Sequence, residues 1–138
     1  MADQKISDLQ RVTLFSQCSK PELQSLAQNS DEVDLPADKT LITQGRPHDT
    51  FYLLLEGRVE VAVAGEPPRY LGPGDIFGEM SMLDRGPATA TVTTRSPVRA
   101  LVMSHTQFQS AVQGNDTIAL KVIAVMAQRL RHDPRGGQ

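Results

Sequence analysis

The sequence is poor in side chains that several functions depend on. It has no tryptophan, two tyrosines and four phenylalanines in 138 residues. Because single-stranded nucleic acids are usually held by stacking their bases on aromatic rings, this composition argues against such a platform. The single cysteine, Cys18, excludes an internal disulfide and a multi-cysteine zinc site, and a small buried thiol is its simplest role.

Basic charge and long apolar runs are also lacking. The formal net charge is -2, whereas broad nucleic-acid binding relies on a basic surface. No apolar run approaches the roughly 20 residues of a membrane helix, and the N-terminal segment lacks the apolar core of a secretory signal. We therefore expect a cytoplasmic protein that binds neither nucleic acid nor membrane.

Helical patterns occur at both ends of the sequence. Residues 5–29 predict two helical pieces, the second capped by Ser19 with Pro21 in its first turn. Residues 105–131 predict two more helices with apolar faces, and residues 132–138 predict a frayed tail. The helices are thus expected to flank whatever lies between them.

Residues 30–104 show the period of β structure, with about eight short strands separated by turn residues. Residues 51–55 are nearly all apolar, which predicts a strand buried on both faces, and Glu56-Gly57 predicts a tight hairpin after it. We predict one domain over residues 1–138. Its fold class is mainly β, an antiparallel barrel or jelly roll with helices at its ends.

Two runs within this region resemble a known family. Residues 45–59 are similar to the β-roll hairpin of cyclic-nucleotide-binding domains, and residues 71–80 are similar to the strand and glycine turn that lead into the family's phosphate-binding cassette. The resemblance extends from about residue 14 to residue 130. It implies an eight-stranded β-roll with N-terminal helices, a short cassette helix and two C-terminal helices, B and C.

The cassette is expected at residues 77–89. Gly78 would let the backbone approach a ligand closely, and the backbone N–H groups of Met80 and Ser81 would meet a cyclic phosphate. The resemblance gives Glu79 the ribose 2′-hydroxyl and Thr89 a hydroxyl contact with the phosphate. The predicted ligand-binding residues are Phe77, Gly78, Glu79, Met80, Ser81, Ala88 and Thr89, with Val61 and Leu71 lining the slot for the base.

Ala88 departs from the family pattern, in which an arginine at this position pairs with the phosphate. Losing a buried charge partner costs on the order of 2–5 kcal/mol. Affinity would then fall roughly thirtyfold to several thousandfold. Arg85 stands three residues earlier, and a transfer of the role to it is the less favoured alternative.

The C-terminal region differs from that of the family's transcription factors. Residues 115–130 resemble the first half of the C helix, which in those proteins continues, dimerises and leads to a DNA-binding domain. Here Pro134 and two glycines precede the last residue, Gln138. A DNA-binding domain is therefore not expected.

Two non-enzymatic functions follow. The first is a regulatory domain, a ligand sensor in signal transduction, with affinity weakened at Ala88. Its expected ligand is cyclic AMP rather than cyclic GMP, because cyclic AMP is the commonest ligand of the family that the sequence resembles, and no residue selects between the two. The second is an interaction module that keeps the fold without the ligand. In that case Val122, Val125 and Met126 on the last helix would meet a protein effector or a second copy of the chain.

A cupin-like metalloenzyme is the least favoured function. Such an enzyme would use a similar jelly roll, but His48, His105 and His132 stand far apart and no His-x-His pair occurs. No nucleophile, base and acid lie close together in the sequence either. We therefore assign no catalytic residue, no metal ligand and no cofactor beyond the cyclic nucleotide.

Overall fold

A computed structural model describes residues 2–132 of the chain. These residues form two compact units. The helical unit contains residues 2–29 and 109–132, and the strand unit contains residues 30–108. Of the predicted tail, His132 is the last residue of a helix, and residues 133–138 lie outside the described residues. That the chain is one domain stays a prediction.

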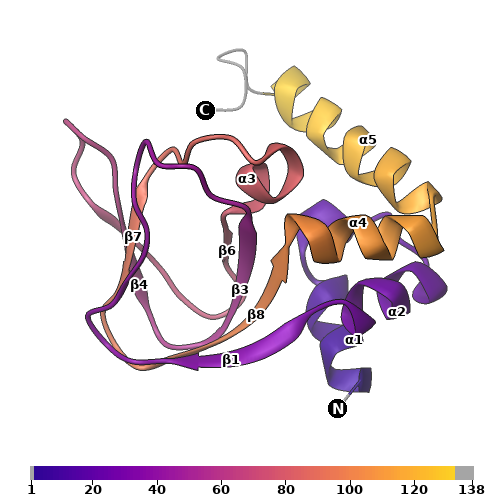
Figure 1. The fold of residues 1–138 in the computed structure, drawn as a ribbon, viewed down its shortest axis with the longest axis horizontal. Helices are drawn as coiled ribbons and strands as arrows, with labels where there is room; N and C mark the ends of the chain where they lie inside the picture. The colour runs from indigo at the N-terminus through magenta and orange to yellow at the C-terminus, as the bar shows by residue number, and fades with distance from the viewer. Residues whose placement is uncertain (1, 133–138) are drawn as a thin grey trace. The chain divides into compact units, whose positions relative to one another are not determined.

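The strand unit consists of two four-stranded antiparallel sheets, ordered β1-β8-β3-β6 and β2-β7-β4-β5 (Figure 1). A short helix, α3, follows β6. This arrangement confirms the predicted eight-stranded antiparallel β-roll with a cassette helix. The elements are β1 (Asp31–Leu35), β2 (Thr40–Ile42), β3 (Thr50–Glu56), β4 (Val59–Ala62), β5 (Arg69–Leu71), β6 (Ile76–Phe77), α3 (Glu79–Asp84), β7 (Thr91–Thr94) and β8 (Val98–Ser104).

The predicted hairpin at Glu56-Gly57 is wrong. Strand β3 pairs with β6 and β8, whereas β4 pairs with β5 and β7, so the turn joins the two sheets. Gly57 has a φ of +93°, and a Cβ there would lie 2.3 Å from the backbone oxygen of Pro97. The chain therefore turns a corner against the neighbouring β7–β8 connection, where only glycine fits.

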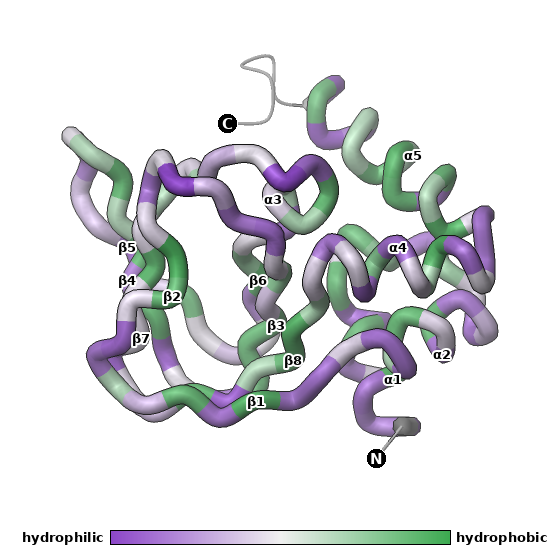
Figure 2. Tube along the Cα trace, viewed as in Figure 1, coloured by the Kyte–Doolittle hydropathy of each residue, from purple (hydrophilic) through white to green (hydrophobic). Residues whose placement is uncertain are grey.

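The core of the strand unit lies between the sheets. On β3, the consecutive residues Leu53 and Leu54 are both buried, which confirms that both faces of this strand are covered. Figure 2 shows β3 and β8 as largely hydrophobic segments. Residues from both sheets make up the buried cluster: Ile42, Leu54, Val59, Val61, Phe77, Ala88, Val92, Val98 and Ala100.

The helical unit begins earlier than predicted, at Ala2, because its first helix extends over the polar N-terminal residues. Ser19 caps the second helix as predicted. It forms a capping box in which the Ser19 hydroxyl accepts from Glu22 N and Ser19 N donates to Glu22 Oε1. The elements are α1 (Ala2–Gln10), a 3₁₀ turn (Thr13–Phe15), α2 (Lys20–Gln28), α4 (His105–Gly114), which crosses from the strand unit, and α5 (Thr117–His132).

Helix α5 has apolar residues on two faces. Ile118, Val122 and Val125 are buried, and Met126 is half-buried, so the stripe predicted as an interface is turned largely inward. Other large apolar side chains on α5 are exposed: Leu120, Ile123 and Leu130. Within residues 2–132, no helix combines the length and apolar character that crossing a membrane requires.

Candidate ligand-binding site

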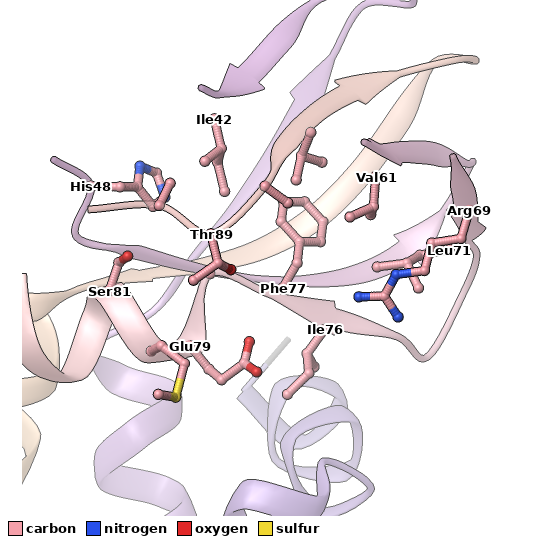
Figure 3. A pocket seen from close by; sticks show the side chains of 15 residues that line it. Ile42, His48, Val61, Arg69, Leu71, Ile76, Phe77, Glu79, Ser81 and Thr89 are labelled. Carbon is pink, nitrogen blue, oxygen red and sulfur yellow. The ribbon is translucent and has the colours of Figure 1, made fainter. Parts of the chain in front are cut away.

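A cavity of about 280 Å³ opens in the strand unit (Figure 3). Its volume is near the lower end of the range for small-molecule sites, roughly 300–1,000 Å³. All nine residues predicted from the sequence to bind a ligand line it: Val61, Leu71, Phe77, Gly78, Glu79, Met80, Ser81, Ala88 and Thr89. Six further lining residues were not predicted: Ile42, His48, Arg69, Ile76, Ala90 and Val92.

Gly78 fixes the start of the cassette helix against β3. It is the residue before α3 and has a left-handed backbone with a φ of +80°. A Cβ at this position would lie 2.2 Å from the backbone oxygen of Thr50, a distance that no side chain tolerates. The close approach predicted for Gly78 is therefore first a contact with the protein's own β3, and it places Glu79 and Met80 at the cavity wall.

Hydrogen bonds within the cassette hold the end of α3. The buried Ser81 donates its hydroxyl to the backbone oxygen of Gly86 at 3.1 Å, and Gly86 N donates to Asp84 Oδ1 at 2.7 Å. Arg85 has a left-handed backbone, and its guanidinium donates to Thr106 Oγ1 at 3.4 Å. Arg85 does not line the cavity, so the structure offers no support for a transfer of the arginine role to it.

Ala88 is held in place by its backbone. Ala88 N donates to the oxygen of Arg46 at 2.8 Å, and Gly45 N donates to the oxygen of Ala88 at 2.8 Å. An isolated bridge between Pro47 and Pro87 continues this pairing. The side chain of Ala88 is 8% exposed and lines the cavity, so a longer side chain at this position would reach into it.

The two ends of the cavity differ in chemistry. Figure 3 shows His48, Ser81 and Thr89 near one end, and Leu71 and Arg69 at the other. Arg69 stands opposite Val61 in the β4–β5 pairing, so the two side chains share one face of the sheet. This explains why Arg69, the first residue of β5, lines the cavity together with Val61. Among the described lining residues, Arg69 and Glu79 are the charged ones.

A stack of three rings supports the wall next to His48. The His48 and Tyr52 rings are 6.2 Å apart and nearly parallel, and the Tyr52 and Phe77 rings are 4.8 Å apart and also nearly parallel. Burial, followed by the charge of Asp49, raises the pKa of the Tyr52 phenol, which keeps it neutral. The stack joins the β2–β3 loop to β3 and β6.

The six lining residues that were not predicted differ in how visible they are in the sequence pattern. Ile42 and Val92 lie in predicted strands, and the period-2 pattern would have assigned them to the core face. His48 and Arg69 stand in or beside loops, where no periodicity applies, and no local signal points to them. In the described part of the chain, no group of three His, Cys, Asp or Glu side chains could hold a metal ion.

Residues 32–115, which contain every strand after the first and the whole cavity lining, match the family described as "Cyclic nucleotide-binding domain". The chain belongs to this family. Its β-roll and the cassette geometry at Gly78 agree with this membership, which confirms the resemblance drawn from the sequence.

The curated relatives of this cyclic nucleotide-binding domain are longer proteins, and the matched region is one part of each. A "CRP-like cAMP-activated global transcriptional regulator" of Mycobacterium tuberculosis (strain CDC 1551 / Oshkosh) is 30% identical over 128 residues, which cover 89% of this chain and 57% of the relative. "Acetyltransferase Pat" of Mycolicibacterium smegmatis is 37% identical over 102 residues, which cover 71% of this chain and 31% of that enzyme.

A similar solved structure is the N-terminal domain of a transcriptional regulator from Streptomyces coelicolor A3(2). The TM-score is 0.78 at 29% sequence identity, and the match covers 87% of each chain. The present chain thus matches a solved domain over 87% of each chain, whereas the aligned regions span 57% and 31% of the two curated relatives named above.

Proposed function

We propose that the protein is a non-enzymatic regulatory module that binds a cyclic nucleotide in the cavity of the strand unit. The observation that carries this proposal is convergence. Nine residues from four separate stretches of sequence, chosen for one ligand, line one cavity of suitable size. In the proposed mode the ribose lies at Glu79, the cyclic phosphate at Ser81 and Thr89, and the base between Val61 and Leu71.

We propose weak binding, because no cation replaces the family's arginine at Ala88. Ser81 already donates its hydroxyl to Gly86 O, so its backbone N–H is the group left for the phosphate. Met82 N is engaged with Gly78 O, which limits the backbone donors to the residues before it. Backbone donors and the Thr89 hydroxyl can still donate hydrogen bonds to the anionic phosphate, but they do not form the bidentate ion pair that an arginine would add.

Cyclic AMP is the first ligand to test, because the relatives include a regulator described as cAMP-activated. One observation favours cyclic GMP as a second candidate. Arg69 lies at the end of the cavity proposed for the base, and arginine has only donors. Guanine offers two acceptors, O6 and N7, on the edge where adenine pairs one acceptor with a donor. Arg69→Ala should therefore weaken cyclic GMP binding more than cyclic AMP binding.

The alternative is a ligand-independent interaction module. The exposed residues Leu120, Ile123 and Leu130 on α5 favour it, since they offer an apolar face for a protein effector or a second copy of the chain. Of the three residues predicted for this role, Val122 and Val125 are buried and Met126 is half-buried, so they are less accessible to a partner than the exposed face is. The acetyltransferase relative is an enzyme, but this chain spans 31% of it, and we assign the regulatory part alone.

Calorimetric titration with cyclic AMP and cyclic GMP up to millimolar concentration tests the proposal. We expect measurable heat and a rise in melting temperature with at least one of them, and weaker binding by Glu79→Gln. Glu66→Gln is the matched control, because Glu66 is exposed in the loop before β5. A wild-type protein that shows neither heat nor a melting shift with either ligand, at any concentration, would leave the interaction module as the better assignment.

A further inference from the structure

His48 stands at the end of the cavity where the proposed ligand carries its charge. We propose that the protonated imidazole of His48 supplies positive charge next to Ala88, so that affinity for an anionic nucleotide rises as pH falls. This inference rests on the proposed function, and it adds a pH-dependent residue to the same cavity. His48 lines the cavity together with the cassette residues Gly78, Ser81 and Thr89.

The backbone brings His48 to the cassette. The bridge between Pro47 and Pro87 and the hydrogen bond from Ala88 N to Arg46 O pair the loop before His48 with the end of the cassette. At the start of the cassette, a Cβ built on Gly78 would lie 3.5 Å from His48 Nε2. His48 is therefore adjacent to both ends of the cassette, and Figure 3 shows it near Ser81 and Thr89.

Neighbouring groups fix the ring and its tautomer. His48 Nε2 lies 2.8 Å from the backbone oxygen of Thr50. Because a carbonyl oxygen only accepts, Nε2 carries a hydrogen in both charge states, and Nδ1 is the atom that gains or loses the proton. The parallel ring of Tyr52, which is itself stacked on Phe77, holds the plane of the imidazole. Protonation thus adds charge without requiring the side chain to move.

Other ionisable groups lie beside His48 in the sequence or line the same cavity. Glu79 lines the same cavity, and Asp49 follows His48, with its Oδ1 accepting from the Thr50 hydroxyl at 3.0 Å. Burial raises the pKa of the Tyr52 phenol, so the ring stacked on His48 stays neutral. Arg69 is at the opposite end of the cavity, where it acts on the base end of the ligand.

The charge on a bound cyclic phosphate favours the protonated imidazole. Imidazole is the side chain that ordinarily changes charge between about pH 5 and pH 8. A cyclic phosphodiester keeps one negative charge across that range, so the ligand itself introduces no pH dependence. Binding of the anion and protonation of His48 then favour each other by the same factor, as linkage requires.

The test measures the dissociation constant for cyclic AMP at several values between about pH 5.5 and pH 8. We expect the wild-type affinity to be about threefold to tenfold higher at the acidic end of this range. This is the change in affinity that the attraction within one partly screened charge pair would produce. His48→Gln keeps a donor for Thr50 O but cannot gain a charge, so its affinity should not vary with pH. His48→Lys keeps its charge throughout and should bind equally well at both ends.

His105→Gln is the matched control. His105 Nδ1 also lies near a backbone oxygen, that of Met82 at 2.7 Å, but His105 does not line the cavity. This variant should retain the wild-type pH profile. Adenosine, which has no phosphate, should bind with the same affinity at each pH in wild type and in His48→Gln.

The outcomes separate this inference from the proposed function. If wild type binds and His48→Gln retains the full pH dependence, the role of His48 is overturned while the proposed function stands. If neither wild type nor Ala88→Arg binds cyclic AMP or cyclic GMP at any pH, both proposals are overturned. Melting curves of each variant show whether it folds, and His48→Lys gives an independent answer should His48→Gln be unstable.

Discussion

In the helical unit, hydrogen-bond donors surround a buried negative charge. In the cavity of the strand unit, the uncharged Ala88 stands where the resemblance to the family implies a positive charge. In the helical unit the carboxylate of Glu22 is 2% exposed, and it accepts hydrogen bonds from Lys121 Nζ, Thr117 Oγ1 and Ser19 N. In the cavity, Ala88 stands at the position where the resemblance to the family implies an arginine. One negative charge is part of the folded chain, and the other is expected to arrive with a ligand.

Because of this difference in charge partners, substitutions in the two regions should have different effects. A buried ion pair is weak evidence for stability, but removing one of its partners leaves a buried charge and is costly. Changes around Glu22 should therefore alter the free energy of unfolding. Substitutions at the cavity should alter ligand affinity instead. Among the described residues, the free protein has no buried charge there that needs a cation at position 88, so its stability does not depend on one.

The largest expected effect is on acid stability. Burial raises the pKa of Glu22, but the hydrogen bonds from Lys121, Ser19 and Thr117 outweigh it and lower the pKa from 4.5 to about 2. Since the folded pKa is depressed, the stabilisation is present above about pH 4.5 and is lost as pH falls through 2. The difference of 2.5 between these two values corresponds to about 3 kcal/mol.

Urea unfolding at a series of pH values checks this prediction. The gap in unfolding free energy between wild type and Glu22→Gln should narrow by about 3 kcal/mol from pH 5 to pH 2. A gap that stays constant over this range would show that Glu22 titrates alike in the folded and unfolded chain.

Lys121→Met should have the next largest effect. It removes the cation from the buried Glu22 and should cost about 2–3 kcal/mol of unfolding free energy, less than the full cost of breaking a buried pair because Lys121 is 34% exposed. Lys39→Met, at an exposed lysine, is the matched control and should leave stability nearly unchanged. Equal losses from the two variants would contradict a specific role for the pair.

Ala88→Arg should raise affinity without a comparable loss of stability. It places a guanidinium at the cavity wall, and we expect cyclic-nucleotide binding to strengthen at least tenfold, about 1.4 kcal/mol. Calorimetric titration gives the affinity, and Ala64→Arg adds the same charge in an exposed loop as a control. An unchanged affinity in Ala88→Arg would mean that the cavity is closed to the ligand in another way.

The smallest effect is expected at the surface of the strand unit. Arg99 forms ion pairs with Glu32, Asp34 and Glu56 at 3.5–3.8 Å, and these side chains are all substantially exposed. Because exposed pairs are screened by water, Arg99→Gln should change the unfolding free energy by less than about 1 kcal/mol. A loss as large as that of Lys121→Met would remove the distinction between the buried and exposed pairs.

Local chemistry and motif spacing account for the features that were predicted correctly. Ser19 and Glu22 form their capping box within one helical turn, so four neighbouring residues suffice to predict it. The cassette residues from Phe77 to Ser81 are contiguous, and the resemblance to a family placed them in one cavity with Thr89. That they bind a ligand stays a prediction.

Features set by distant parts of the chain were missed or wrongly assigned. Turn chemistry at Glu56-Gly57 specifies a reversal but not which sheet the next strand joins, so the hairpin was wrong. His48 reaches the cavity only through pairing with the segment around Pro87, which no local pattern encodes. Helix α5 carries apolar residues on two faces, and periodicity alone does not tell which face is buried.

The backbone anchoring of Ala88 has a consequence for which side chains this position can accept. Its two main-chain hydrogen bonds, to Arg46 and Gly45, do not depend on which side chain stands at position 88. A single substitution can therefore add or delete the charge at the cavity wall while the loop keeps its course. The charge at the cavity wall is thus set by one side chain, independently of the backbone that positions it.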